Sequence, residues 1–223
     1  MTDAADRSYA SRAGRKLAHA LDAFSVDVSG LACADLGSNV GGFTDCLLQH
    51  GADHVYSVET GYGVLAYPLR IDSRVTVLER TNALHVEPHE AVDLVVVDLG
   101  WTRQRHAVPA ALRWLKPEGR IISLIKPHYE QAGTGQSAGE YRGGLDEAAS
   151  RQVLDQVLAE MPSFGVTVAQ WVVSPLTGSK SSRRRRKQKR DGQPGKSNSL
   201  SAGGNREYLA LLVPTTDQPH ESV

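Results

Sequence analysis

The chain has 223 residues, of which 40% are hydrophobic and 22% charged, and its formal net charge at pH 7 is zero. This composition is typical of a soluble globular protein, and the length suffices for one α/β domain with a full core. No apolar run is long enough to cross a bilayer and the first ten residues lack a signal-peptide pattern, so the cytoplasm is the expected compartment. Cys33 and Cys46 lie in apolar surroundings, which favours buried thiols over a disulfide or a metal site.

The first half of the chain alternates between helical and strand-like patterns. Within residues 11–24 the apolar positions recur at helical spacing, which predicts an N-terminal helix. A second helix is predicted at 41–51, with Gly51 ending it. Short runs rich in Val, Ile and Leu predict four strands, at 31–36, 54–59, 75–79 and 92–99.

The second half continues the alternation. Helices are predicted at 106–116 and 145–161, and strands at 120–126, 166–174 and 207–214. Continuous Val, Ile and Leu runs are typical of strands that are covered on both faces. The sequence therefore predicts a doubly wound, Rossmann-like α/β fold, with a seven-stranded, mostly parallel sheet and helices on both faces. We expect one domain at 11–213, between disordered ends at 1–10 and 214–223.

The last two predicted strands are joined by a segment without helical periodicity. Residues 179–204 are rich in Gly, Ser and basic residues, which predicts a flexible insertion. Ten of the 25 Lys and Arg residues fall between Lys180 and Arg206, where Asp191 is the only acidic residue. The rest of the chain carries 15 basic residues against 24 acidic ones. This asymmetry favours a polyanionic partner for the insertion, and the alternative is an inert solvated loop.

The stretch ADLGSNVGGFT, residues 34–44, joins the first predicted strand to a helix, where open α/β sheets bind nucleotides. A dinucleotide fingerprint requires a glycine where Asn39 stands, and no Gly-Lys-Ser/Thr follows to make a phosphate loop. Glu59 ends the second strand, where an acid can accept hydrogen bonds from both ribose hydroxyls. A nucleoside cofactor without a pyrophosphate is S-adenosylmethionine, and the alternative is a purely structural turn.

Two charged residues end neighbouring predicted strands. Asp98 follows VDLVVV and Lys126 follows RIISLI, and ligands of doubly wound sheets bind at such carboxyl ends. A buried lysine without a partner is expensive, so a carboxylate is expected beside it. The cluster HVEPHE lacks the H-E-x-x-H spacing and is interpreted as a surface turn, so no metal site is expected.

The order and wording of several motifs resemble the FtsJ-like ribose 2′-O-methyltransferases, most closely the methyltransferase domain of their TlyA branch. The resemblance covers about residues 11–213 and is carried by SRAGRKLAHALDAF, ADLGSNVGGFTDCLLQHGA, VYSVETGYGVL, VLERTNA, VDLVVVDL, LIKPHYE, SPLTG and GNREYL. It implies a methyltransferase that uses S-adenosylmethionine and acts on structured RNA, with ribosomal RNA as the expected substrate.

The resemblance also implies roles for individual residues. The catalytic Lys-Asp-Lys-Glu set falls on Lys16, Asp98, Lys126 and Glu207. Residues expected at the cofactor are Asp35, Gly37, Ser38, Asn39, Gly41, Gly42, Phe43, Thr44, Glu59, Asn82 and Asp98.

Lys126 is interpreted as the general base that accepts the proton of a ribose hydroxyl. A lysine at its ordinary pKa of about 10.4 is protonated at neutral pH. We expect burial and Lys16 to lower the pKa of Lys126 and Asp98 to raise it. The alternative is a structural ion pair between Lys126 and Asp98.

The sequence departs from the family where RNA is expected to bind. TlyA-like proteins carry an N-terminal S4-type RNA-binding domain, whereas about ten residues precede the matching region here. WTRQRHAV also replaces a hydrophobic run after VVVDLG. We therefore expect RNA contacts from Arg12, Arg183, Arg184, Arg185, Arg186, Lys187, Lys189 and Arg190. Two alternatives remain, a methyltransferase of small molecules and a non-catalytic RNA-binding relative.

Overall fold

The computed structural model describes residues 8–131, 145–178 and 205–215. The basic insertion at 179–204, and all but a few residues of the ends that were expected to be disordered, lie outside these ranges. No helix in the described residues is both long and apolar enough to span a bilayer.

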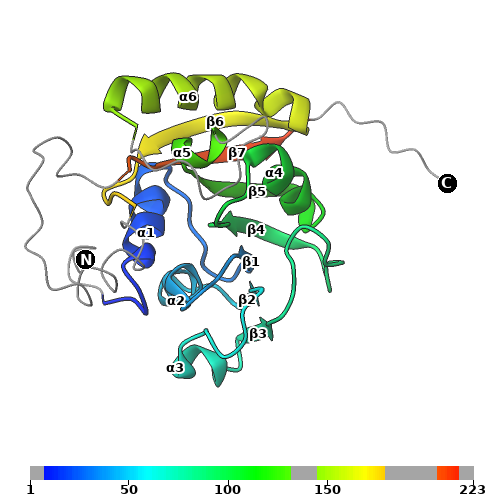
Figure 1. Cartoon of the computed structure of the whole chain (residues 1–223). Coiled ribbons are helices and arrows are strands. Elements are labelled where there is room, and N and C mark those ends of the chain that lie inside the picture. The colour runs from blue at the N-terminus through cyan, green and yellow to red at the C-terminus, as the bar shows by residue number, and fades with distance from the viewer. Residues whose placement is uncertain (1–7, 132–144, 179–204, 216–223) are drawn as a thin grey trace, which may run out of the picture.

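Seven strands form one sheet in the order β3-β2-β1-β4-β5-β7-β6 (Figure 1). The first five strands in this order pair in parallel, and β7 runs antiparallel to both β5 and β6. The expected mostly parallel sheet of seven strands is thereby confirmed. The strands are β1 (Ala32–Leu36), β2 (His54–Val58), β3 (Val75–Leu78), β4 (Val92–Val97), β5 (Leu115–Ile125), β6 (Val166–Val173) and β7 (Tyr208–Pro214).

Helices cover both faces of the sheet (Figure 1). On one face, Leu17 and Phe43 pack in a core cluster with Val96 of β4. On the other, Val108 and Leu154 share a cluster with Val95, the preceding residue of the same strand. Adjacent valines of β4 thus point into opposite cores, which explains its unbroken apolar run. The helices are α1 (Ala13–Ala23), α2 (Gly42–Gln49), α3 (Tyr67–Arg70), α4 (Gln104–Leu112), α5 (Pro127–Glu130), α6 (Glu147–Glu160) and the 3₁₀ helix η2 (Met161–Phe164).

The predicted helix at 106–116 is wrong at its C-terminal end. Helix α4 ends at Leu112, and β5 already begins at Leu115. Pro117 accounts for the difference, because a proline disfavours helical backbone at the residue before it. Trp114 is fully buried and marks the change from helix to strand.

The chain reverses its direction of winding between β1 and β4. From β1 it passes outward to β2 and β3, whereas β4 and β5 lie on the opposite side of β1. The carboxyl ends of β1 and β4 therefore flank the position where open α/β sheets hold their ligands.

Candidate active site

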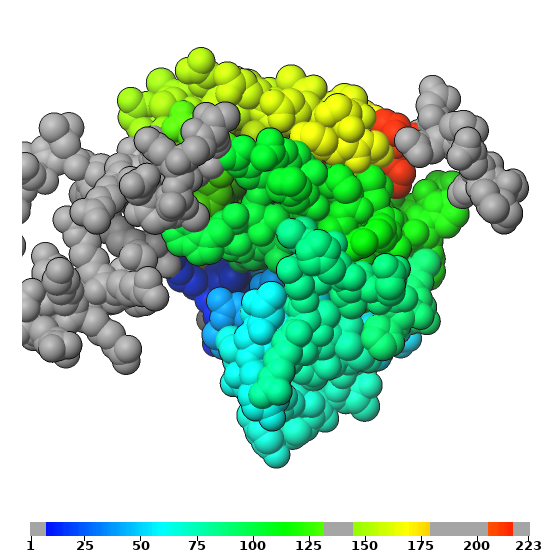
Figure 2. Space-filling view, turned by 45° about the vertical axis from the view of Figure 1, so that its right-hand side comes forward, coloured from blue at the N-terminus to red at the C-terminus, as the bar shows by residue number. Residues whose placement is uncertain are grey.

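A cavity of about 390 Å³ opens at the carboxyl ends of β1 and β4. Its walls include all four residues of the expected catalytic set, namely Lys16, Asp98, Lys126 and Glu207. In the space-filling view, blue surface from the N-terminal part of the domain lies set back between its cyan and green parts (Figure 2). The fold therefore brings together residues from the start, middle and end of the chain.

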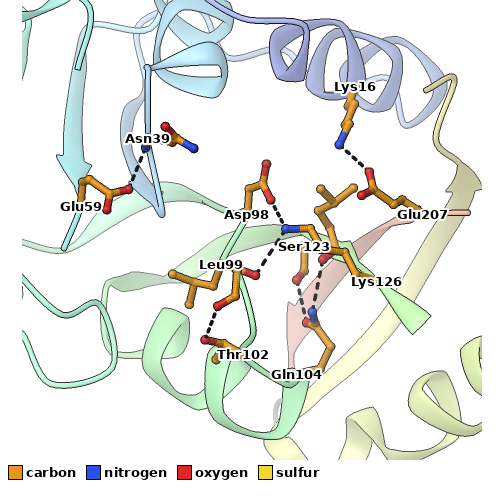
Figure 3. Close-up of polar contacts among 12 residues, drawn as sticks. Lys16, Asn39, Glu59, Asp98, Leu99, Thr102, Gln104, Ser123, Lys126 and Glu207 are labelled. Atoms are coloured by element: carbon orange, nitrogen blue, oxygen red, sulfur yellow. Dashed lines mark hydrogen bonds and ion pairs between the residues drawn. The ribbon is translucent and has the colours of Figure 1, made fainter. Parts of the chain in front are cut away.

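Lys126 and Asp98 form an ion pair on the cavity wall (Figure 3). Asp98 follows β4 directly, and Lys126 lies between the last residue of β5 and Pro127, which begins α5. The Lys126 ammonium also donates to the Leu99 carbonyl oxygen at 3.4 Å. Both side chains are largely buried, with exposed fractions of 12% for Lys126 and 20% for Asp98. The expected carboxylate partner of this lysine is therefore present.

The pKa of Lys126 is raised above its ordinary value. Burial is the largest influence and lowers this pKa, but the Asp98 carboxylate outweighs it, through charge and through a hydrogen bond, with Glu207 adding to the effect. Lys16, which was expected to lower this pKa, is not among its main influences, and the Lys16 ammonium is paired with Glu207. Lys126 is therefore an ammonium at neutral pH in this structure.

Lys16 and Glu207 form the second ion pair, which joins α1 to the residue just before β7 (Figure 3). Their side chains are only 8% and 4% exposed. Gly178 lies against this pair, since a Cβ atom there would sit 2.7 Å from Oε1 of Glu207. A side chain at position 178 would displace this carboxylate oxygen, so glycine allows the close approach of the two residues.

The glycine-rich turn after β1 shapes the opposite wall of the cavity. Backbone amides of Gly37 and Ser38 donate to the Val58 carbonyl oxygen at 2.9 and 3.1 Å. Gly37 has a φ of +92°, and a Cβ atom there would lie 2.7 Å from the Asp98 carbonyl oxygen. The amide of Asn39 donates to Glu59 Oε2 at 3.0 Å. The turn is therefore fastened both to Glu59 and to the strand end that presents Asp98.

Two buried polar atoms in this wall have no hydrogen-bond partner among the described residues. They are Oδ1 of Asp35, which is fully buried, and Oγ of Ser38. The other carboxylate oxygen of Asp35 accepts a hydrogen bond of 2.7 Å from Thr44. Burial raises the pKa of Asp35 to about 7, against the lowering influence of that hydrogen bond. Because buried polar groups are normally satisfied, these atoms fit a ligand that brings hydrogen-bond donors, such as the amino-acid part of S-adenosylmethionine.

The expected cofactor residues divide into two groups. Asp35, Gly37, Ser38, Asn39, Phe43 and Asp98 line the cavity, whereas the cavity walls do not include Gly41, Gly42, Thr44, Glu59 and Asn82.

Two members of the second group, Gly42 and Asn82, make other contacts. A Cβ atom on Gly42 would clash with Oγ of Ser11, so this glycine permits the contact between the segment before α1 and the start of α2. The Asn82 side chain is exposed and accepts a hydrogen bond from the amide of Leu84 at 3.0 Å.

The cavity also contains side chains that sequence reasoning did not assign. His128 and Tyr129 of α5 line it beside Lys126. Burial and the Lys126 charge lower the pKa of His128 to about 4, so its imidazole is neutral at pH 7. The exposed Trp101 ring packs on Tyr129 with centroids 4.6 Å apart. The only sequence signal for His128 and Tyr129 is the motif KPHYE, whose lysine directly follows β5.

The expected RNA-binding residues are described only in part. Arg12 is exposed, precedes α1 and lines the cavity. The residues from Arg183 to Arg190 lie outside the described ranges. Gly178 and Asn205, the described residues on either side of 179–204, both line the cavity. The Gly178 amide donates to the Asn205 carbonyl oxygen at 2.8 Å.

Comparison with known proteins gives a consistent result. The family model of FtsJ-like methyltransferases matches residues 9–184. The Mycobacterium tuberculosis protein named 16S/23S rRNA (cytidine-2′-O)-methyltransferase TlyA is 44% identical over 134 residues, which are 59% of this chain and 50% of that protein. Hemolysin A of Brachyspira hyodysenteriae is 32% identical over 77% of this chain and 72% of its own length. The chain thus spans about half the length of the TlyA protein it matches.

Solved structures share the same fold. A Streptococcus thermophilus protein with a provisional hemolysin name superposes with a TM-score of 0.76 at 29% identity, covering 96% of this chain and 70% of that one. A geranyl diphosphate methyltransferase, solved in complex with SAM, superposes with a TM-score of 0.57 at 15% identity, covering 90% of this chain and 85% of that one. The second likeness concerns the fold alone.

Proposed function

The chain belongs to the FtsJ-like methyltransferase family, and on that premise we propose that it transfers a methyl group from S-adenosylmethionine to a ribose 2′-hydroxyl of structured RNA, namely ribosomal RNA. One observation carries the proposal. Two lysine–carboxylate pairs, Lys126 with Asp98 and Lys16 with Glu207, lie in the wall of the cavity that the glycine-rich turn also lines. The rRNA (cytidine-2′-O)-methyltransferase name of the M. tuberculosis relative supports the choice of hydroxyl and of RNA.

The residues of the glycine-rich wall would hold the cofactor. Asp35 and Ser38 offer buried polar atoms to its amino-acid part, and Glu59 offers its carboxylate to the ribose. Asn39 occupies the position that a dinucleotide pyrophosphate would need, so NAD should not bind. When bound, S-adenosylmethionine supplies an electrophilic methyl group on a sulfonium.

Lys126 would accept the proton of the attacking hydroxyl. The O–H bond breaks as the new O–C bond forms and the C–S bond breaks, and the proton passes to the neutral amine of Lys126. Asp98 then holds the resulting ammonium in place. Because Asp98 raises the pKa of Lys126, the neutral amine is a minor form at pH 7. The rate of methyl transfer should therefore rise about tenfold per pH unit across the neutral range.

Lys16 and Glu207 would orient the substrate. The Glu207 carboxylate is an acceptor for a ribose hydroxyl, and Lys16 keeps this carboxylate at the cavity wall. Both side chains are buried, so neither is free to turn toward solvent. In this proposal Lys126 accepts the proton, whereas Lys16 and Glu207 align the ribose.

The direct test measures incorporation of labelled methyl groups into ribosomal RNA, followed by mapping of ribose methylation by mass spectrometry. Lys126→Ala should abolish transfer while the affinity for S-adenosylmethionine, measured by calorimetry, stays within about twofold. Lys126→Arg should also be inactive, because a guanidinium does not release its proton at neutral pH. The exposed Lys116 supplies a matched control, Lys116→Ala, with full activity expected.

Normal turnover by Lys126→Arg would contradict the general-base role. Methyl transfer to small metabolites, with none to RNA, would instead favour a small-molecule methyltransferase. Calorimetry that showed NAD binding without S-adenosylmethionine binding would remove the proposed activity altogether.

A further inference from the structure

Gln104 is a buried polar residue behind the catalytic strand. It is the first residue of α4, and only 3% of it is exposed. Its side-chain Oε1 accepts a hydrogen bond from Ser123 Oγ at 2.7 Å, and its Nε2 donates to the Leu124 carbonyl oxygen at 3.4 Å. Its backbone amide donates to Glu130 Oε1 at 2.9 Å. One residue thus holds three groups on the segment that carries Lys126.

These three contacts bracket Lys126 in the sequence. Leu124 lies two residues before the lysine, and Glu130 is the last residue of α5, four residues after it. The register of β4 with β5 ends at the pair Val97 and Ser123. Beyond that pair, β5 has no further pairing with β4. The Gln104 side chain forms its hydrogen bonds here, with Ser123 and Leu124, as the close-up shows (Figure 3).

Gln104 is also tied to Asp98, the partner of Lys126. Residues 98–104 form the connection from β4 to α4, with Asp98 at one end and Gln104 at the other. Asp98 and Gln104 are joined by the chain through residues 98–104, and Gln104 forms hydrogen bonds with residues on both sides of Lys126. Because Lys126 forms an ion pair with Asp98, these links make a closed ring. A shift of Gln104 would change the geometry of the ion pair.

We propose that Gln104 is a positioning residue, which sets the Lys126 amine against Asp98 for proton transfer, by binding Ser123, Leu124 and Glu130. This inference rests on the proposed function for its catalytic meaning, but its geometric part is testable without any substrate. The competing interpretation is that Gln104 merely satisfies buried polar groups and contributes to stability alone.

The groups that face Lys126 determine what a loosened ion pair would do. Asp98 and Glu207 raise its pKa, whereas burial lowers it. His128 and Tyr129 of α5 lie beside it, and Lys16 of α1 lines the same cavity. With Asp98 held less closely, the balance moves toward burial, and the pKa of Lys126 falls. A role in stability alone predicts no such change.

The first experiment measures the pKa of Lys126 without turnover. Wild-type protein and Gln104→Leu are labelled with acetic anhydride over a pH series, and the modification of Lys126 is compared with that of the exposed Lys116 by mass spectrometry. We expect the pKa of Lys126 to fall by at least about 0.5 unit in the variant, because an opposite charge nearby favours the ammonium. Thr102→Val, which removes a hydrogen bond in the same connection, should leave it unchanged. An unchanged pKa in Gln104→Leu would overturn the proposal.

The second experiment separates position from stability. Gln104→Leu should lower kcat about 10- to 100-fold with little change in KM, because small misplacements of a reacting group are costly in rate. This variant also leaves the buried Ser123 hydroxyl without its hydrogen-bond acceptor. The double variant Gln104→Leu with Ser123→Ala removes that hydroxyl and should regain melting temperature.

In the double variant kcat should stay low, and the acidic limb of the pH–rate profile should stay displaced toward lower pH. Recovery of kcat together with melting temperature would show a role in stability alone and overturn the proposal. If wild-type protein methylates no RNA, the proposed function falls, while the labelling experiment still decides whether Gln104 positions Lys126.

Discussion

Asp98→Asn is the sharpest test of the electrostatics around Lys126. Two unit charges about 4 Å apart interact by roughly 4 kcal/mol at an effective dielectric constant of 20, which corresponds to about three pKa units. The Lys126 and Asp98 side chains are only 12% and 20% exposed, so screening by solvent and salt removes a minor part of this interaction. Because an asparagine still accepts a hydrogen bond, we expect the pKa of Lys126 to fall by about 2–3 units.

The direction follows from the balance of influences on this lysine. Burial is the largest single influence on the pKa of Lys126 and lowers it, and Asp98 is the main group that overcomes burial. Without that carboxylate charge, burial should prevail and take the pKa below its ordinary value. Glu207→Gln should cause a smaller decrease, because Glu207 is a weaker influence on Lys126 and is paired with Lys16.

Competitive labelling of lysines over a pH series, read out by mass spectrometry, measures both variants. The melting temperature of each variant serves as a control for unfolding. The reasoning would be refuted by a pKa of Lys126 that is unchanged in Asp98→Asn, or by a larger decrease in Glu207→Gln.

Three further predictions concern the cofactor wall and the insertion. The pKa of Asp35 is raised to about 7, so the folded state binds the carboxyl proton more tightly than the unfolded chain does. The loss of this proton therefore destabilises the fold increasingly as pH rises from about 4 to about 7. Asp35→Asn should therefore increase the free energy of unfolding by up to about 4 kcal/mol at pH 8 but not at pH 4, so its melting temperature should exceed that of the wild type at pH 8 only. The same variant should weaken S-adenosylmethionine binding, and equal melting temperatures of variant and wild type at pH 8 would contradict this reasoning. Gly37→Ala should lower the free energy of unfolding by about 1–3 kcal/mol in urea titrations, because its φ of +92° and the nearby Asp98 carbonyl leave no room for a Cβ, and an unchanged midpoint would count against that. Replacing Arg183 to Arg186 with serine should flatten the dependence of RNA affinity on salt without altering cofactor affinity, whereas equal slopes would indicate an inert loop.

Much of the sheet could be predicted from the sequence because its central strands contain short apolar runs. The runs ending at Leu36, Val58 and Val97 are buried on both faces, and such runs have few other interpretations. The predicted boundary between helix and strand near Trp114 is wrong, although Pro117 indicates an earlier end of the helix. The short helices α3 and α5 were not predicted, since four residues are too few to show a helical period.

The candidate active site could be predicted only in part from local pattern. Lys126 attracts notice because a charge ends an apolar strand, and Asp98 does so for the same reason. Lys16 and Glu207 are 191 residues apart, so their contact depends on the whole fold, and only resemblance to a family indicated it. The direction of the pKa shift of Lys126 was not predictable, because it depends on which lysine each carboxylate binds. Gln104 gave no signal at all, since its role lies in what it packs against.

The hydrogen bond between Gly178 and Asn205 has a consequence for how this chain could be altered. It draws together the two ends of the 26-residue segment between them at the cavity rim. When the ends of a segment already meet, its length has little effect on folding, since doubling a flexible loop costs only about 0.6 kcal/mol. This junction is therefore a natural grafting point. A segment of different length or charge grafted there would begin and end at the cavity that Lys126 also lines, while the sheet stays unaltered.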